Sequence, residues 1–326
     1  MRKLMYGAAI AAVSMMAFGS GAYAESGFPT KPIKYIIAFP PGGGSDTNSR
    51  ILIPFLEKHL GPKAEIIPQN VKGAGGKVGW NALAAAKPDG YTLGMLNLEI
   101  MVVSTIDSKV RYKVDSFDMV GNINYDPTVI GVPASSKYRT LKDIVTAAKA
   151  SPGKVTVGIP TIGGAIGLLL FEGMAGVEFN IVLFGGGGPT RNALLGSHVP
   201  SIAMSMGALT RFKKKIHMLG QMAQKRQPHG PWVPTFKEQG YDLSMGVHRS
   251  VGGPAGIPKS VLAKLRSAMA KASADPDFKA AMKKRKLPIG YVDGPGLEKL
   301  KNDGHKAFSK IWAKKQWSVK KKKKKK

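Results

Sequence analysis

The chain has 326 residues, enough for two domains of ordinary size, each with its own hydrophobic core. It contains no cysteine, which excludes disulfides, thiol nucleophiles and cysteine-based metal sites. Its formal net charge is +29, and such a field favours anionic ligands, phospholipid headgroups or nucleic acid as partners. The alternative interpretation is that the excess lysines lie on solvated helix faces that carry few acidic residues.

The first residues have the pattern of an export signal. Arg2 and Lys3 precede a short apolar run over 4–18, and Ala22-Tyr23-Ala24 fits a small-x-small cleavage site. We therefore expect residues 1–24 to be a signal peptide and the mature chain to begin near Glu25. An uncleaved membrane anchor stays open as the alternative. At the other end, the lysine run 320–326 predicts a disordered tail.

The first glycine-rich stretch after the signal joins a predicted strand to a predicted helix. An apolar run over 33–39 reads as a buried strand, Gly42 to Asp46 as a turn, and residues 47–60 as an amphipathic helix. A turn of this kind leaves backbone N–H groups unpaired at the positive end of the helix dipole, where anions bind. We expect Ser45 or Asp46 to cap the helix. The stretch thus predicts a site for a small carboxylate.

A second glycine-rich loop, over 73–76, does not complete a nucleotide-binding motif. The Walker pattern needs glycine at 71 and serine or threonine at 78, and both positions are valine. The dinucleotide spacing fails as well, because its last glycine is replaced by Thr47 in the first loop and by Val78 in the second. Nucleotide chemistry is therefore unsupported.

The remaining predicted elements repeat the same arrangement of strand, glycine-rich loop and helix. Strands are predicted over 64–68, 91–95, 117–123, 128–132, 155–159, 181–184, 201–204 and 244–251, and helices over 78–86, 140–150, 167–175, 208–212, 259–273, 277–285 and 296–315, with a further helix from Thr190. Two halves built alike predict two α/β lobes. In open α/β sheets, ligands bind at the carboxyl ends of the strands, where these loops lie.

The side chains that catalysis or metal binding would need are not grouped. The six histidines are scattered without metal-ligand spacing, and no nucleophile elbow of the G-x-S-x-G type is present. We therefore predict no catalytic residues, no metal and no cofactor. Arg249 is a further candidate, for pairing with a second carboxylate of the ligand.

The order of the motifs resembles the tripartite tricarboxylate transporter substrate-binding family, also called Bug or TctC-type receptors. The likeness extends from Phe28 to about Trp317. The motifs that carry it are Phe28–Ile33, Phe39-Pro-Pro-Gly-Gly-Gly-Ser-Asp46, Gly73-Ala-Gly-Gly76, Lys87-Pro-Asp-Gly-Tyr-Thr-Leu93, Gly185–Gly187, Leu194–Val199, Val233–Tyr241 and Pro254-Ala-Gly-Ile-Pro258.

The resemblance implies a periplasmic receptor of the type II, flytrap architecture, in which each lobe is a mixed sheet flanked by helices. Lobe 1 would comprise 25–126 and 245–319, and lobe 2 would comprise 127–244. Such receptors capture small carboxylates and deliver them to membrane permease subunits, and we expect this chain to be a monomer. The loop at Gly42–Asp46 and a partner loop at Thr161–Ala165 would grip the carboxylate through backbone N–H groups and waters.

The second-lobe loop departs from the family pattern, because the serine and histidine that many relatives carry there are missing from residues 163–168. This less polar loop implies a more apolar acid as ligand, or a weakened site. The predicted ligand-binding residues are Gly42, Gly43, Gly44, Ser45, Asp46, Asn97, Thr161, Gly163, Gly164, Ala165, Gly186, Gly187 and Ser205.

Two other functions stay open on the sequence. The net charge fits a basic surface protein that binds nucleic acid or an anionic membrane, although no specific nucleic acid is predicted. An enzyme on the same fold would need an acid and base pair, and the sequence offers none that can be named.

Overall fold

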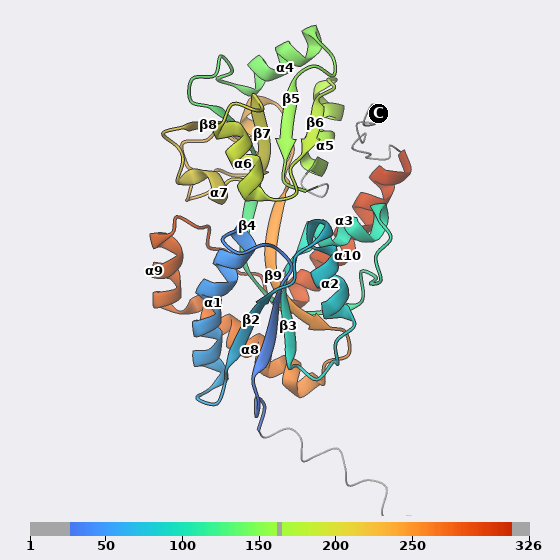
Figure 1. Ribbon diagram of the computed structural model, residues 1–326, viewed down its shortest axis with the longest axis vertical. Helices are drawn as coiled ribbons and strands as arrows, with labels where there is room; N and C mark the ends of the chain where they lie inside the picture. Colours follow the sequence, from blue (N-terminus) through green and yellow to red (C-terminus); the bar gives the residue numbers. More distant parts are fainter. Residues whose placement is uncertain (1–26, 162–164, 315–326) are drawn as a thin grey trace, which may run out of the picture.

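A computed structural model describes residues 27–161 and 165–314 of the chain. The predicted signal peptide, Gly163, Gly164 and the terminal lysines lie outside the described residues. Two lobes are stacked along the long axis of the molecule and are joined by the strands β4 (Phe117–Pro133) and β9 (Gly246–Pro254) (Figure 1). The predicted α/β, two-lobed fold class is confirmed.

Lobe 1 is built on three parallel strands that run into helices. Strand β1 lies between β2 and β3, and β3 pairs in antiparallel fashion with β9, so this half of the sheet is mixed. Helices α8 and α10, from the end of the chain, pack against α1 and α3 of this lobe. Its elements are β1 (Ile33–Ile37), α1 (Gly44–Leu60), β2 (Ile66–Asn70), a 3-10 turn (Ala74–Gly76), α2 (Lys77–Ala84), β3 (Thr92–Asn97), α3 (Leu98–Asp107), α8 (Lys259–Ala274), α9 (Pro276–Lys284) and α10 (Gly294–Lys314).

Lobe 2 repeats the plan with shorter strands. Strand β5 pairs in parallel with β6 and β7, while β7 and β8 pair in antiparallel fashion with β4. A capping box starts α4, since Thr140 and Asp143 bond reciprocally there. The elements are α4 (Leu141–Ala150), β5 (Thr156–Ile159), α5 (Ile166–Ala175), β6 (Asn180–Leu183), α6 (Gly187–Leu195), β7 (Ser201–Ser205), α7 (Gly207–Thr210), β8 (Ile216–Gln221) and a 3-10 turn (Lys237–Gln239).

Strands β4 (Phe117–Pro133) and β9 (Gly246–Pro254) carry the sheet from one lobe to the other. The prediction of two separate strands on either side of Tyr125–Pro127 was wrong, because β4 is continuous. Pro127 is tolerated because it lies where pairing with β9 ends, opposite Gly246, and pairing with β7 begins. Because the pairing partner changes at this residue, the missing proline N–H costs the sheet few hydrogen bonds. The lobe boundaries at 126/127 and 244/245 stay a prediction.

Separate apolar cores stabilise the two lobes. In lobe 1, Tyr35, Leu52 and Phe278 are fully buried in one cluster, and Trp80 centres a second. In lobe 2, Phe171 packs edge-on against Phe236. None of the helices in the described ranges is long and apolar enough to cross a membrane.

Glycine at position 79 is needed for α2 to pack on β1. A Cβ at Gly79 would lie 2.7 Å from the Ala38 Cβ and 2.7 Å from the Val71 carbonyl oxygen, closer than real Cβ atoms approach. Gly173, an exposed glycine in α5, has open space at the same position.

We therefore expect Gly79→Ala and Gly173→Ala to change stability in opposite directions. Gly173→Ala should stabilise by roughly 0.5–1 kcal/mol through helix propensity, whereas Gly79→Ala should destabilise by about 1–3 kcal/mol through overpacking. Thermal or urea unfolding of both variants measures the difference. An equal gain in both would contradict the close packing of α2.

Candidate functional site

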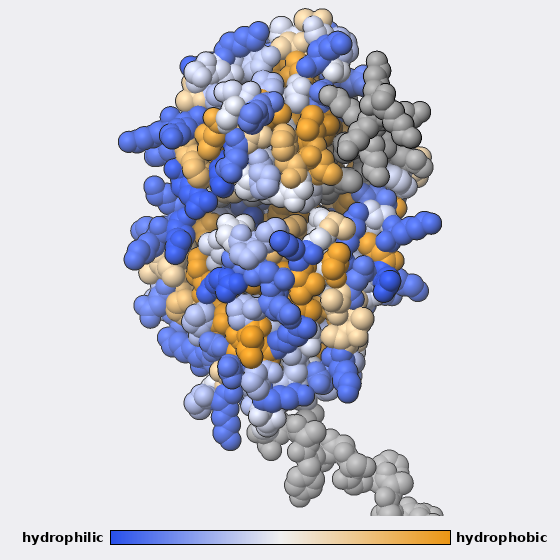
Figure 2. Space-filling view, in the orientation of Figure 1, coloured by the Kyte–Doolittle hydropathy of each residue, from blue (hydrophilic) through white to orange (hydrophobic). Residues whose placement is uncertain are grey.

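A cavity of about 240 Å³ lies between the lobes. A furrow between the two lobes crosses the face of the molecule seen in Figure 2. Residues from lobe 1, from lobe 2 and from the two crossing strands line the cavity together. They are Phe39, Pro40, Pro41, Gly42, Gly43, Gly44, Ser45, Asn97, Ile100, Thr128, Pro160, Thr161, Gly186, Gly187, Gly188, Pro189, Met204, Ser205, Ala208, Val247 and Arg249.

Three helices start at this cavity. Gly43, Asn97 and Gly186 are the N-cap residues of α1, α3 and α6, and all three line the cavity wall. Within the described ranges, none of these N-caps makes a side-chain capping hydrogen bond. The first-turn N–H groups, which have no intrahelical partner, therefore stay available at the positive ends of three helix dipoles. Their convergence favours an anion in the cavity.

The two glycine-rich loops have a backbone that depends on glycine. Gly42 has a φ of 73° and Gly185 has a φ of 75°, both in the left-handed region that side chains disfavour. Each glycine lies directly before the N-cap residue of its helix, so it sets the direction in which the helix leaves the loop.

Asp46 supports the first loop from behind the cavity wall. Its carboxylate accepts hydrogen bonds from the Gly42 N–H at 2.9 Å, from Arg50 at 2.9 Å and from Asn70 at 3.0 Å. Burial alone would raise the pKa of Asp46, but these donors outweigh it and hold that pKa below its usual value. The N-cap of α1 is Gly43, so the expectation that Ser45 or Asp46 occupies the cap position was wrong; Asp46 instead reaches back from the first turn.

Arg249 brings a buried positive charge to the cavity. It lies on β9 opposite Asn97 of β3 and Asn124 of β4, and its residue is 5% exposed. The Nη1 group donates to Asp126 at 3.0 Å and to Asn124 at 3.2 Å, and Nη2 donates to Ser205 at 3.1 Å. The buried Nε has no hydrogen-bond partner among the described residues. Arg249 thus keeps one donor unused beside the cavity.

Gly44 allows the guanidinium to lie against the first turn of α1. A Cβ at this position would lie 3.1 Å from the Arg249 Nη2. Two positive groups, the Arg249 side chain and the start of α1, therefore share one wall of the cavity. An anion placed between them is attracted by both.

Asp126 offsets part of this charge from the other side. It is 1% exposed, and in addition to Arg249 it accepts a hydrogen bond from the Gly207 N–H and lies 3.6 Å from the His229 Nε2. Burial by itself would raise the pKa of Asp126, but His229, Arg249 and Gly207 outweigh it and hold that pKa below its usual value. Asp126 stays ionised and anchors the guanidinium in the crossing strands.

The other walls of the cavity are mostly apolar. Phe39, Ile100 and Val247 face it from lobe 1 and β9, while Pro189 and Met204 face it from lobe 2. The space corresponds to roughly eight water molecules at about 30 Å³ each. The cavity therefore suits a small acid with an apolar body.

The structure places most of the predicted site residues in this one cavity. Gly42, Gly43, Gly44, Ser45, Asn97, Thr161, Gly186, Gly187 and Ser205 line it. Asp46 and Ala165 are buried outside its lining, the latter in the core of lobe 2, and Gly163 and Gly164 lie outside the described residues.

Asn97 and Ser205, both predicted site residues, make specific contacts in the structure. The Ser45 hydroxyl donates to the Asn97 side-chain oxygen at 3.0 Å, and Ser205 accepts from Arg249. The cavity residues that sequence reasoning missed, such as Thr128 and Met204, lie on paired strands in lobe 2 and carried no local signal. The described residues contain no group of histidine, aspartate or glutamate side chains that could hold a metal ion.

Comparisons of sequence and of structure with known proteins both find relatives that match most of this chain. A curated protein of Cupriavidus necator, a UPF0065 protein, is 30% identical over 295 residues, which is 88% of each chain. A TctC solute-binding protein from Polaromonas, solved without ligand, has a TM-score of 0.70 and 28% identity and covers 88% of this chain and 100% of its own. MatC of Rhodopseudomonas palustris, solved with bound malate, shares the fold with a TM-score of 0.77 at 22% identity, over 87% of this chain and 99% of its own.

The family model for the tripartite tricarboxylate transporter family receptor, TctC, matches residues 50–316. This match covers most of the chain and confirms the resemblance that the glycine-rich motifs indicate. The chain belongs to the TctC family of solute-binding receptors.

Proposed function

We propose that this protein is an exported receptor that captures a small organic carboxylate between its lobes and delivers it to the permease subunits of a tripartite tricarboxylate-type transporter. The observation that carries the proposal is the position of Arg249. Its guanidinium lies beside the cavity where α1, α3 and α6 begin, with one buried donor unused. Family membership and the malate bound to MatC support the same class of ligand.

Capture proceeds by closure of the two lobes. The carboxylate first binds the N–H groups at the start of α1 together with Arg249, and α6 and Thr161 of lobe 2 then close over it. Only a ligand that contacts both lobes stabilises the closed form, because the shift between two states equals the difference in affinity for them. The protein works as a monomer and catalyses no reaction.

The apolar walls select the ligand's body. Met204 and Pro189 present apolar surface on the lobe 2 side, so an acid with an aliphatic or aromatic body should bind more tightly than a hydroxylated tricarboxylate of similar charge. The carboxylate supplies the charge, and the body supplies the selectivity.

A thermal-shift screen of the mature chain against organic acids, at physiological salt, tests the function. We expect at least one small carboxylate to raise the melting temperature. At a ligand concentration of 100 times Kd, binding adds about 2.7 kcal/mol to the free energy of unfolding. Tight binding of heparin or DNA at that salt, with no response to any acid, would support a basic surface protein instead.

The charge of Arg249 is tested by replacing it together with its partner. Arg249→Met alone would leave the Asp126 carboxylate buried without its guanidinium partner, at a cost of about 3–5 kcal/mol. The double variant Arg249→Met/Asp126→Asn avoids this, and we expect it to fold but to bind the best acid of the screen at least ~10-fold more weakly. Isothermal calorimetry measures the affinity.

A matched control removes an ion pair far from the cavity. Lys299 and Asp303 form an exposed pair on α10 at 2.5 Å, so Lys299→Met/Asp303→Asn should leave the affinity unchanged. Unchanged affinity in the Arg249/Asp126 variant would show that the guanidinium takes no part in binding.

Occupancy of the cavity is tested at Gly188. A Cβ built there meets open space, and the residue lines the cavity, so Gly188→Leu fills the site without strain. We expect its melting temperature to stay near that of the wild type while the acid-induced shift disappears. Gly173→Leu, on the exposed face of α5, should keep the full shift. If Gly188→Leu also kept it, the ligand would bind elsewhere.

A further inference from the structure

A second and larger cavity, of about 440 Å³, lies between the lobes on the side where α7 faces α9 (Figure 1). Its walls come from both lobes. Lobe 2 supplies Thr210, Lys213, Pro228, His229 and Trp232, and lobe 1 supplies Lys283, Lys286, Leu287, Pro288 and Ile289. None of these residues lines the cavity described above.

The lining combines apolar surface with positive charge. Trp232 and Ile289 are each 48% exposed and lie at this one cavity, one from each lobe, so they give it apolar surface that solvent reaches. Lys213, Lys283 and Lys286 lie at the same cavity, and none of the three forms an ion pair with an acidic side chain in the described ranges. The Lys213 Nζ lies 4.7 Å from the centre of the Trp232 ring. An aromatic face and three uncompensated cations suit an aromatic anion.

A buried polar atom lies at the same cavity. The His229 side chain is 8% exposed, and its Nε2 makes no hydrogen bond to any described residue. It lies 3.6 Å from the Asp126 Oδ1, beyond hydrogen-bond distance. The His229 Nε2 therefore has an ion-pair contact with Asp126 but no hydrogen bond, and a buried polar nitrogen without a hydrogen bond is costly unless a ligand or water supplies one.

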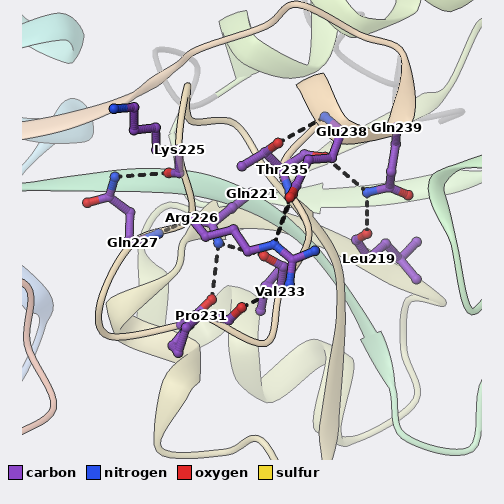
Figure 3. Close-up of polar contacts among 11 residues, drawn as sticks. Leu219, Gln221, Lys225, Arg226, Gln227, Pro231, Val233, Thr235, Glu238 and Gln239 are labelled. Carbon is purple, nitrogen blue, oxygen red and sulfur yellow. Dashed lines mark hydrogen bonds and ion pairs between the residues drawn. The ribbon is translucent and has the colours of Figure 1, made fainter.

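The wall that carries His229 and Trp232 is held in place before any ligand arrives. The Gln221 side chain donates to the carbonyl oxygens of Gly230 at 3.1 Å and Val233 at 2.7 Å (Figure 3). Arg226 donates to the Pro231 carbonyl at 3.1 Å and to both Glu238 oxygens at 3.0 Å (Figure 3). These bonds fix the loop on both sides of Trp232. Ligand binding therefore loses little free energy to ordering of this loop.

We propose that this second cavity binds a small aromatic organic anion as an effector, separately from the transported solute. The ring lies against Trp232 among Pro228, Pro288 and Ile289, and the anionic group lies near the three lysines. The occupant bridges the lobes, and Asp126 connects the two cavities because it contacts both His229 and Arg249. Any effect of one occupant on the affinity of the other cavity is equal in both directions.

The proposal is tested by calorimetry with 2-naphthoate and its neutral analogue 2-naphthamide, at physiological salt. We expect 2-naphthoate to bind the wild type and 2-naphthamide to bind roughly 10-fold more weakly, because the amide lacks the charge. Trp232→Leu and Lys213→Gln/Lys283→Gln/Lys286→Gln should each weaken 2-naphthoate at least ~10-fold. A control with Lys142, Lys149 and Lys154 changed to glutamine, three exposed lysines of lobe 2 that do not line this cavity, should bind as the wild type does.

The Gly188→Leu variant separates this site from the solute cavity. Filling the solute cavity should leave 2-naphthoate binding in place, even if no carboxylate is ever found for that cavity. Three results would overturn the proposal: no binding of 2-naphthoate, equal binding of naphthoate and naphthamide, or unchanged affinity in the Trp232 and triple-lysine variants. Loss of binding in Gly188→Leu would place the probe in the solute cavity and overturn it as well.

Discussion

The ion pair between Arg249 and Asp126, buried where β4 and β9 cross from one lobe to the other, is the interaction on which the site depends. Two charges taken out of water are stable there only because each has further partners: Asn124 and Ser205 for the guanidinium, and the Gly207 N–H for the carboxylate. These partners come from both lobes and from the crossing strands. The pair thus fixes a positive charge beside the solute cavity, at a place that both lobes reach.

Around this charge, backbone N–H groups provide most of the hydrogen-bond donors that face the cavity. Three helices begin at the cavity without side-chain caps in the described residues, and glycines at 42 and 185 give the loops the left-handed turns that aim two of them. Asp46, tied to Gly42 and Arg50, holds the first loop in shape without entering the cavity. Neutral N–H donors with one shared cation can hold an acid and still release it, as a receptor in a transport system requires.

Much of this was predictable from the sequence, because the decisive signals are local. Glycine-rich turns between strand and helix patterns marked Gly42–Ser45 and Gly186–Gly187, and the repeated order marked two lobes. The role of Arg249 was harder to predict, since it depends on pairing across three strands that are far apart in the chain. The continuity of β4 through Pro127 was missed for the same reason: it depends on partners that change at that residue. The basic second cavity also depends on distant segments, around residues 213, 232 and 286.

The central claim is that an acid binds between the two glycine-rich loops with its carboxylate on Arg249. The most direct measurement is a crystal structure of the mature chain grown with the acid that stabilises it most. The account predicts carboxylate density within hydrogen-bond distance of the Arg249 guanidinium and of the first-turn N–H groups of α1 and α6. Ligand density confined to another part of the molecule, with the guanidinium contacting only Asp126, Asn124 and Ser205, would contradict it.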